Sequence, residues 1–158
     1  MRILLLTVLL FSFMAAPAQE ERDTVLNRCP VYITDTATAN NFFLEFQKTT
    51  LKVYRNQGNL TIGFQQKDQF FTVFFKEKKL RNGKYAIVSG ERGKMEVNAK
   101  YSFMSGEQVS YVDVSRGTME SIFDKEKNLW HIKLTGQIAN SVGRTVSYFK
   151  VRADFWIK

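Results

Sequence analysis

Apolar and polar residues alternate most regularly at the C-terminal side of the chain, in Leu129–Ile138 and Arg144–Lys158, around the polar loop Asn140–Gly143. In each segment every second residue falls on one mostly apolar face: Trp130, Ile132, Leu134, Gly136 and Ile138, then Phe149, Val151, Ala153, Phe155 and Ile157. A period of two is typical of strands with one buried face. We therefore predict a long antiparallel hairpin, which needs further strands because an isolated hairpin is barely stable in water.

Short segments of the same kind precede the hairpin and are separated by glycine-containing or polar turns. They are Asn41–Gln47, Thr50–Arg55, Leu60–Phe64, Gln69–Lys76, Tyr85–Val88, Lys94–Phe103, Val109–Val114 and Gly117–Phe123. Regularly spaced short strands without a helical period indicate an all-β fold, an antiparallel barrel or sandwich of about 8–10 strands. We assign residues 41–158 to a single β domain.

Three of these predictions are more specific. The segment Gln69–Lys76 carries apolar residues on both faces, which is typical of a central strand covered on both sides. Asn82-Gly83 is the sequence signature of a type I′ turn, and it predicts a tight hairpin at that point. Arg116-Gly117 is interpreted as a turn between two separate strands.

The first residues have the pattern of a secretory signal peptide. Arg2 is followed by an apolar run and by the small residues Ala16-Pro17-Ala18, so we expect residues 1–18 to be removed by cleavage after Ala18. The alternative, a membrane anchor, is disfavoured because the run is shorter than the ~20 residues of a spanning helix. Residues 19–40 are polar and predict an N-terminal arm, with one edge strand near Pro30–Thr34. These features predict a secreted or periplasmic protein.

Cysteine content and charge indicate which covalent links and which partners this chain can have. A single cysteine, Cys29, excludes an internal disulfide, and the preceding Leu26-Asn27-Arg28 lacks the small residues of a lipoprotein signal. The formal charge is +8, and it becomes +7 after cleavage because Arg2 is the only charged residue in 1–18. A basic secreted domain favours anionic partners such as a membrane surface or an acidic polysaccharide, with nucleic acid a weaker alternative. The simpler interpretation is that the charge maintains solubility.

No group of residues predicts an enzyme, a metal site or a cofactor. His131, the only histidine, falls on the polar face of its strand, and its one conceivable thiol partner, Cys29, lies in the N-terminal arm. Asp124, Glu126 and Asn128 have the alternate spacing of a calcium loop but lack its glycine and its closing acid. We interpret them as a charged turn and expect no catalytic residue, no metal and no cofactor.

Two sets of residues are candidates for binding. If the sheet encloses a cavity, aromatic residues would line it, and we expect them to include Phe64, Phe75, Tyr101 and Phe149. The outer face of the hairpin mixes cations with aromatic residues, a combination that can hold anions or stack on sugars: Lys133, Tyr148, Lys150, Arg152 and Trp156. The alternatives are a core filled by side chains and a simply solvated face.

Several short motifs occur in an order that resembles a group of known proteins. The motifs are Gly83-Lys84-Tyr85, Tyr101-Ser102-Phe103, Tyr111-Val112, Gly117-Thr118-Met119-Glu120, Leu134-Thr135-Gly136 and the closing strand from Phe149 to Trp156. The pattern resembles small secreted or surface β-proteins of Gram-negative bacteria with a lipocalin-like or sandwich-like sheet. The Gly-x-Trp of lipocalins and the lipidated cysteine common in such proteins are not evident. The resemblance implies no catalytic residues.

These observations lead to one expected function and one alternative. We expect a secreted, non-enzymatic binding domain that carries a small apolar ligand inside a β-barrel. The alternative is a surface module that binds an anionic polymer or the cell envelope through the basic and aromatic sheet face. An enzyme, or a part of an assembly joined through edge strands, has less support from the residues.

Overall fold

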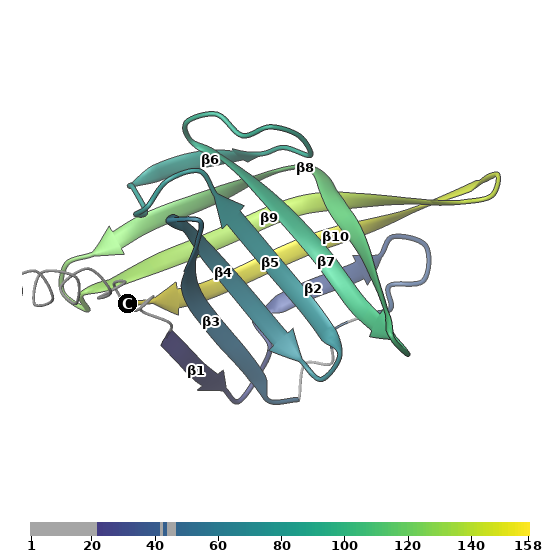
Figure 1. The fold of residues 1–158 in the computed structure, drawn as a ribbon, viewed down its shortest axis with the longest axis horizontal. Helices are drawn as coiled ribbons and strands as arrows, with labels where there is room; N and C mark the ends of the chain where they lie inside the picture. The colour runs from purple at the N-terminus through teal and green to yellow at the C-terminus, as the bar shows by residue number, and fades with distance from the viewer. Residues whose placement is uncertain (1–21, 42, 44–46) are drawn as a thin grey trace, which may run out of the picture.

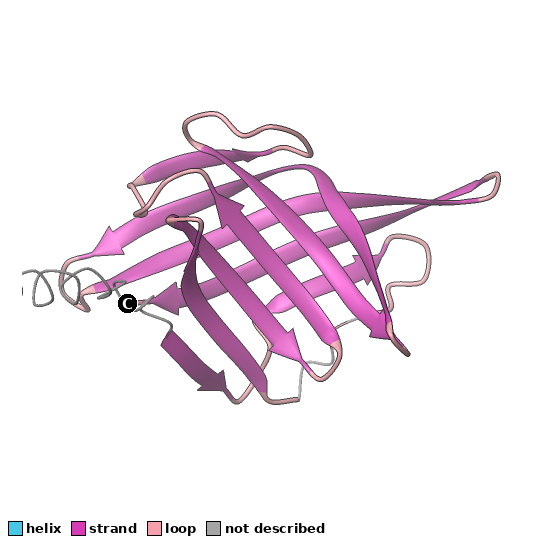
Figure 2. Ribbon diagram, in the orientation of Figure 1, coloured by secondary structure: helices cyan, strands magenta, loops and turns pink. Residues whose placement is uncertain are grey.

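Ten strands form one curled sheet, a half-barrel, in the computed structural model, which describes residues 22–41, 43 and 47–158 (Figures 1 and 2). The strands are β1 (Arg22–Leu26), β2 (Val31–Asp35), β3 (Thr49–Asn56), β4 (Asn59–Gln66), β5 (Gln69–Phe75), β6 (Gly83–Ile87), β7 (Glu96–Ser105), β8 (Gln108–Asp124), β9 (Leu129–Val142) and β10 (Thr145–Ile157). The predicted all-β class is confirmed.

The sheet folds over itself into two layers. Its strand order is β1-β3-β4-β5-β7-β6-β8-β9-β10-β2, with a further pairing between β7 and β8. In Figure 1, β3, β4, β5 and β7 cross in front of β9, β10 and β2. The layers touch where the rings of Phe64 on β4 and Phe155 on β10 pack edge to face, with 4.8 Å between their centroids. The inward faces of both layers therefore share one core.

The C-terminal hairpin has the predicted pairing and faces. β9 and β10 are antiparallel, with Ile138 opposite Phe149 and Trp130 opposite Ile157. Ile132, Leu134 and Val151 are fully buried on the inward face. The alternation continues beyond the predicted end of the first strand, so that β9 extends to Val142 and the connecting turn is shorter than expected.

Strand β8 joins the two layers and differs from its prediction. The expected turn at Arg116-Gly117 is wrong, because β8 continues for 17 residues through a bulge between Val114 and Arg116. Before the bulge β8 pairs with β7, and beyond it with β6. A Cβ atom on Gly117 would lie 2.2 Å from the backbone oxygen of Thr135, so only glycine fits at this crossing.

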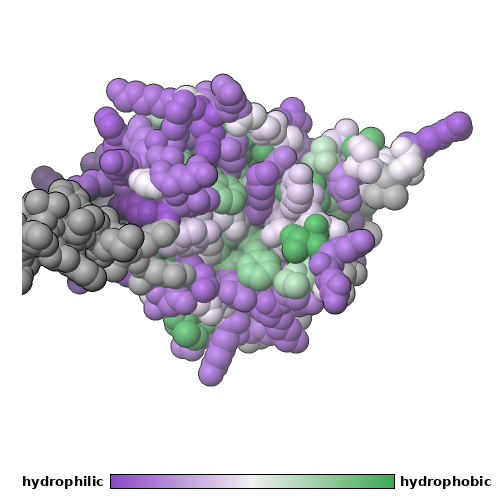
Figure 3. All heavy atoms as spheres, in the orientation of Figure 1, coloured by the Kyte–Doolittle hydropathy of each residue, from purple (hydrophilic) through white to green (hydrophobic). Residues whose placement is uncertain are grey.

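Two other local predictions are wrong. The Asn82-Gly83 hairpin does not form, because β6 pairs with β8 and, in parallel, with β7 rather than with β5. Strand β5 is covered on one face only: Phe71 and Val73 are fully buried, whereas the outward Phe70 and Phe74 are half-buried. Figure 3 shows apolar side chains near the middle of this otherwise hydrophilic face, over β4 and β5.

The predicted N-terminal arm contributes both edges of the sheet where it is described. β1 pairs with β3, and β2, the expected edge strand, pairs with β10. The predicted strand Asn41–Gln47 lies mostly outside the described residues, although Asn41 forms a bridge with Thr34. The predicted signal peptide, 1–18, lies wholly outside them. Within the described ranges, no helix is long and apolar enough to cross a membrane.

Candidate functional site

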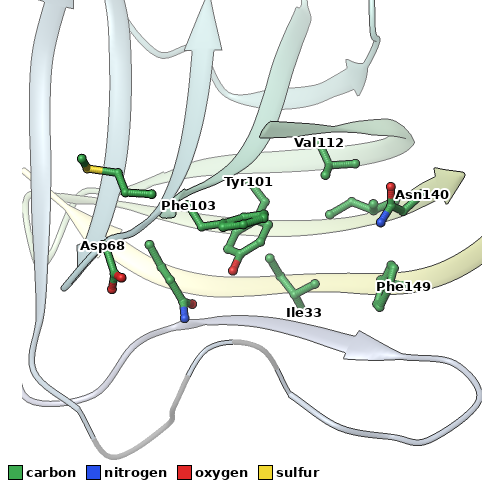
Figure 4. Close-up of a pocket in the computed structure, with 10 residues that line it drawn as sticks. Ile33, Asp68, Tyr101, Phe103, Val112, Asn140 and Phe149 are labelled. Carbon is green, nitrogen blue, oxygen red and sulfur yellow. The ribbon is translucent and has the colours of Figure 1, made fainter. Parts of the chain in front are cut away.

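A pocket of about 390 Å³ opens between the two layers of the half-barrel (Figure 4). Most of its lining is apolar, and it comes from six strands and the β4–β5 turn: Ile33, Asp68, Gln69, Tyr101, Phe103, Met104, Val112, Ile138, Asn140 and Phe149. We call these residues the pocket region. In Figure 4, Tyr101 and Phe103 lie between Asp68 on one side and Asn140 on the other.

The strand pattern accounts for the apolar wall. Tyr101 and Phe103 alternate with outward residues on β7, and Tyr101 is paired with Val112 of β8. Ile138 and Phe149 face each other across the β9–β10 hairpin. Because residues opposite one another in an antiparallel pair project to the same face, these pairs place apolar side chains on both sides of the pocket.

The segment between β2 and β3 also contacts this region. The ring of Phe43, which is fully buried, lies 5.5 Å from the ring of Tyr101 in an edge-to-face arrangement. Asn41 helps to fix the segment, since its Oδ1 accepts hydrogen bonds from the backbone N–H groups of Ile33 and Phe43. This segment therefore contributes a packing contact to Tyr101.

The pocket has a polar end at the β4–β5 turn. The turn consists of Lys67, with φ of 53°, and Asp68, whose backbone oxygen accepts a hydrogen bond from the N–H of Met104 at 2.9 Å. The side-chain oxygen of Gln69 is buried and has no hydrogen-bond partner among the described residues. Burial, with the negative charge of Asp68 as a second cause, raises the pKa of the Tyr101 hydroxyl. Asp68 also lines the pocket, so a negative charge borders this end.

The four predicted interior residues divide into two pairs. Tyr101 and Phe149 line the pocket. Phe64 and Phe75 are fully buried in a filled core, where Phe64 packs on Phe155 and the ring of Phe75 packs edge to face on Tyr85 at 5.6 Å. We call the core around Phe64, Phe75, Tyr85 and Phe155 the packed region. The inward alternation identified all four residues but did not separate the lining from the filling.

A second hollow, the basic groove, lies on the outer face of the back layer and measures about 580 Å³. It is lined by Tyr32, Thr34, Lys133, Leu134, Thr135, Lys150, Arg152, Ala153 and Asp154. Three predicted surface residues, Lys133, Lys150 and Arg152, meet there, and no carboxylate among the described residues lies within ion-pair distance of them. Tyr32 and Thr34 were missed because the sequence did not reveal that β2 pairs with β10.

The other two predicted surface residues lie outside the basic groove. Tyr148 is exposed farther along β10, and its backbone oxygen accepts a hydrogen bond from the Thr36 hydroxyl at 2.9 Å. Trp156 stacks on the ring of His131, with centroids 4.2 Å apart, and the ammonium group of Lys127 lies 4.1 Å from the centre of the indole. The ring of Trp156 is thus occupied within the protein itself, whereas the side chain of Tyr148 is exposed.

His131 and Cys29 do not form a nucleophile pair. The Nε2 atom of His131 lies 2.6 Å from Oδ1 of Asp154 on the outer face. Cys29 is fully buried in the core, and its thiol donates to the backbone oxygen of Val31 at 3.6 Å. Burial raises the pKa of this thiol, which disfavours the reactive thiolate.

The segment that resembles a calcium loop forms a charged turn. Oδ1 of Asp124 accepts hydrogen bonds from the backbone N–H groups of Glu126 and Lys127, both at 3.0 Å. The bond from Lys127 is the first cause of the lowered pKa of Asp124, whose Oδ2 also lies 3.5 Å from the Lys127 ammonium. Across the described part of the chain, no group of three or more histidine, cysteine or acidic side chains is arranged to hold a metal ion.

Comparisons of the chain with protein-family models, with curated proteins and with solved structures gave no match. The resemblance to secreted β-proteins of Gram-negative bacteria and to lipocalins therefore has no support beyond the motifs themselves. The candidate binding sites of this chain are the two hollows, the pocket region and the basic groove.

Proposed function

We propose that the protein is a secreted, non-enzymatic binding protein that holds a small apolar molecule in the pocket region. The observation that carries this proposal is the pocket of about 390 Å³ between the two layers, with a mostly apolar wall. Its size falls within the roughly 300–1,000 Å³ typical of small-molecule sites, which are also concave, largely apolar and supplied with a few polar groups.

The lining explains how such a molecule gains affinity. Phe103, Val112 and Phe149 are only partly buried, although each lies on the inward face of its strand. An apolar ligand that covers them removes this surface from water, and each buried methylene equivalent contributes about 0.8 kcal/mol. The packed region offers no such gain, because its aromatic rings already cover one another.

The test introduces tryptophan at two adjacent positions of β8, one that lines the pocket and one that lies on the surface. Val112→Trp places a large ring in the pocket, whereas Tyr111→Trp changes the adjacent residue, which is 63% exposed on the opposite face. We expect Val112→Trp to abolish the uptake of a small apolar fluorescent dye and Tyr111→Trp to retain it. Equal uptake by both variants would show that the dye binds elsewhere and would contradict the proposal.

A second candidate function is supported by the basic groove. Lys133, Lys150 and Arg152 converge there without a paired carboxylate among the described residues, and Tyr32 supplies an aromatic wall. Cations grouped in a concave surface create a positive potential that attracts anions, so an anionic polysaccharide is the partner that this groove fits. This candidate does not compete with the first for residues, because the groove and the pocket lie on opposite faces of the sheet.

Its test uses charge reversal in matched pairs. Lys150→Glu with Arg152→Glu changes the groove, and Lys78→Glu with Lys79→Glu makes the same change in charge at exposed positions of the β5–β6 loop. We expect only the groove variant to lose salt-sensitive retention on a dextran sulfate column. If both variants elute together, net charge alone governs retention and the groove is not a site.

A further inference from the structure

The polar end of the pocket indicates the chemical class of the ligand. Asp68 is the only charged side chain among the described residues that line the pocket. No described cation lies within ion-pair distance of its carboxylate, and the neighbouring Lys67 is exposed and does not line the pocket. The charge at this end is therefore negative, opposite to the net charge of +8 for the whole chain.

Gln69 adds a second requirement at the same end. Its side-chain oxygen is buried without a hydrogen-bond partner among the described residues, on the inward face opposite Phe103. A buried acceptor left unpaired costs roughly 1–3 kcal/mol, and a ligand that donates a hydrogen bond to it recovers that cost. Carboxylate ligands have no proton to donate at neutral pH, whereas alcohols and ammonium groups do.

Aromatic rings complete the environment. Tyr101 and Phe103 lie next to each other in the pocket, with 5.9 Å between their ring centroids. The face of an aromatic ring attracts a cation through its quadrupole, and a cation held near a carboxylate and a carbonyl oxygen is also hydrogen-bonded. An anionic head group at this position is repelled by Asp68, and it has no proton to donate to Gln69 Oε1.

We propose that the pocket takes a cationic amphiphile, a protonated primary amine on an apolar tail, with the ammonium group at Asp68 and Gln69 and the tail along Val112, Ile138 and Phe149. This assignment rests on the proposed function, since it names the ligand class of the same pocket. It reverses the expectation from net charge, because a chain of +8 attracts anions at long range while the pocket selects a cation at contact.

The experiment compares decylamine, decanol and decanoate, which share one tail, by calorimetric titration of the full mature protein at neutral pH and physiological salt. We expect decylamine to bind about tenfold more tightly than decanoate, with decanol between them, because the exposed carboxylate of Asp68 gives a charge pair of modest strength and Gln69 Oε1 adds a hydrogen bond. Decanoate binding as tightly as decylamine would overturn the assignment but leave the proposed function standing. Failure of all three to bind would overturn both.

Variants locate the head group. Asp68→Asn should lower decylamine affinity about three- to fivefold and raise that of decanoate, whereas Asp113→Asn, an equal charge change on the outer face of β8 beside Lys100, should leave both unchanged. Gln69→Leu should weaken decylamine and decanol but not decanoate, because only the first two donate to the lost oxygen. If Asp113→Asn acts as strongly as Asp68→Asn, the preference comes from net charge and the proposed head-group site is wrong.

Discussion

The packed region and the pocket region belong to one sheet and are built by the same alternation, yet one is full and the other is hollow. In the packed region Phe64 meets Phe155 from the other layer, and Phe75 meets Tyr85, so that every ring is covered by a ring from a distant strand. In the pocket region Phe103, Val112 and Phe149 face inward but remain partly exposed. Inward direction alone therefore does not bury a side chain completely.

The largest expected difference between the two regions is in stability. Phe64→Ala should lower the free energy of unfolding by about 3–5 kcal/mol, because it opens a cavity in a filled core. Phe149→Ala, the same change in the pocket region, should cost only about 1–2 kcal/mol, because the side chain is already partly exposed and lines a space. Urea unfolding of both variants measures the difference, and equal losses would mean that the pocket region is packed in solution.

The next effect concerns β8, which runs from the pocket region at Val112 to the packed region at Met119. Gly117→Ala should cost about 1–3 kcal/mol, because the new Cβ would lie 2.2 Å from the backbone oxygen of Thr135 and force β8 away from β9. Gly90→Ala is the control, since nothing lies within 4 Å of its Cβ position. Thermal unfolding that does not distinguish the two variants would contradict the close crossing of β8 and β9.

The smallest effect is a loss of stability at alkaline pH that differs between the two regions. Burial is the first cause that raises the pKa of both Tyr85 and Tyr101 above the ordinary value of 10.0. Each tyrosine has a higher pKa in the folded state than in the unfolded state. Its neutral hydroxyl therefore contributes fully to stability below the unfolded pKa, near pH 10, and this contribution is lost as the pH rises through the folded pKa. Urea unfolding across this range should show the loss.

Two variants show which tyrosine causes the loss of stability at alkaline pH. Tyr85→Phe should remove more of it than Tyr101→Phe, because Tyr85 is 1% exposed and Tyr101 is only partly buried. Tyr85→Phe also costs about 1 kcal/mol at neutral pH, since the Tyr85 hydroxyl accepts a hydrogen bond from the N–H of Arg81 at 2.9 Å. A wild-type stability that stays constant through the ionisation of tyrosine would contradict both pKa shifts.

The sequence predicted most of the fold because alternation is local. The faces of β9 and β10 could be assigned residue by residue, since period-two burial needs no knowledge of the partner strands. The bulge in β8 and the insertion of β6 between β7 and β8 could not, because both depend on pairings between distant segments. β1 was missed because the exposed residues of this edge strand carry no apolar period.

The site could be predicted only in part, for a related reason. Tyr101 and Phe149 were expected to line a cavity, and they do, but Phe64 and Phe75 are equally apolar and equally inward. The distinction between lining and filling is set by the spacing of the two layers, which no local pattern encodes. The polar end was missed because Asp68 and Gln69 look like ordinary residues of a turn until β7 is placed beside them.

The most direct test of the pocket region as a binding site is an amide chemical-shift map of the protein during titration with decanol, a ligand without charge. We predict that the perturbed amides cluster at residues 101, 103, 112, 138 and 149 and that those of Phe64, Phe75 and Phe155 stay in place. That result would place an apolar ligand in the pocket region and confirm that the two regions differ as described. Shifts centred on the packed region, or none at a saturating concentration of decanol, would contradict the central claim.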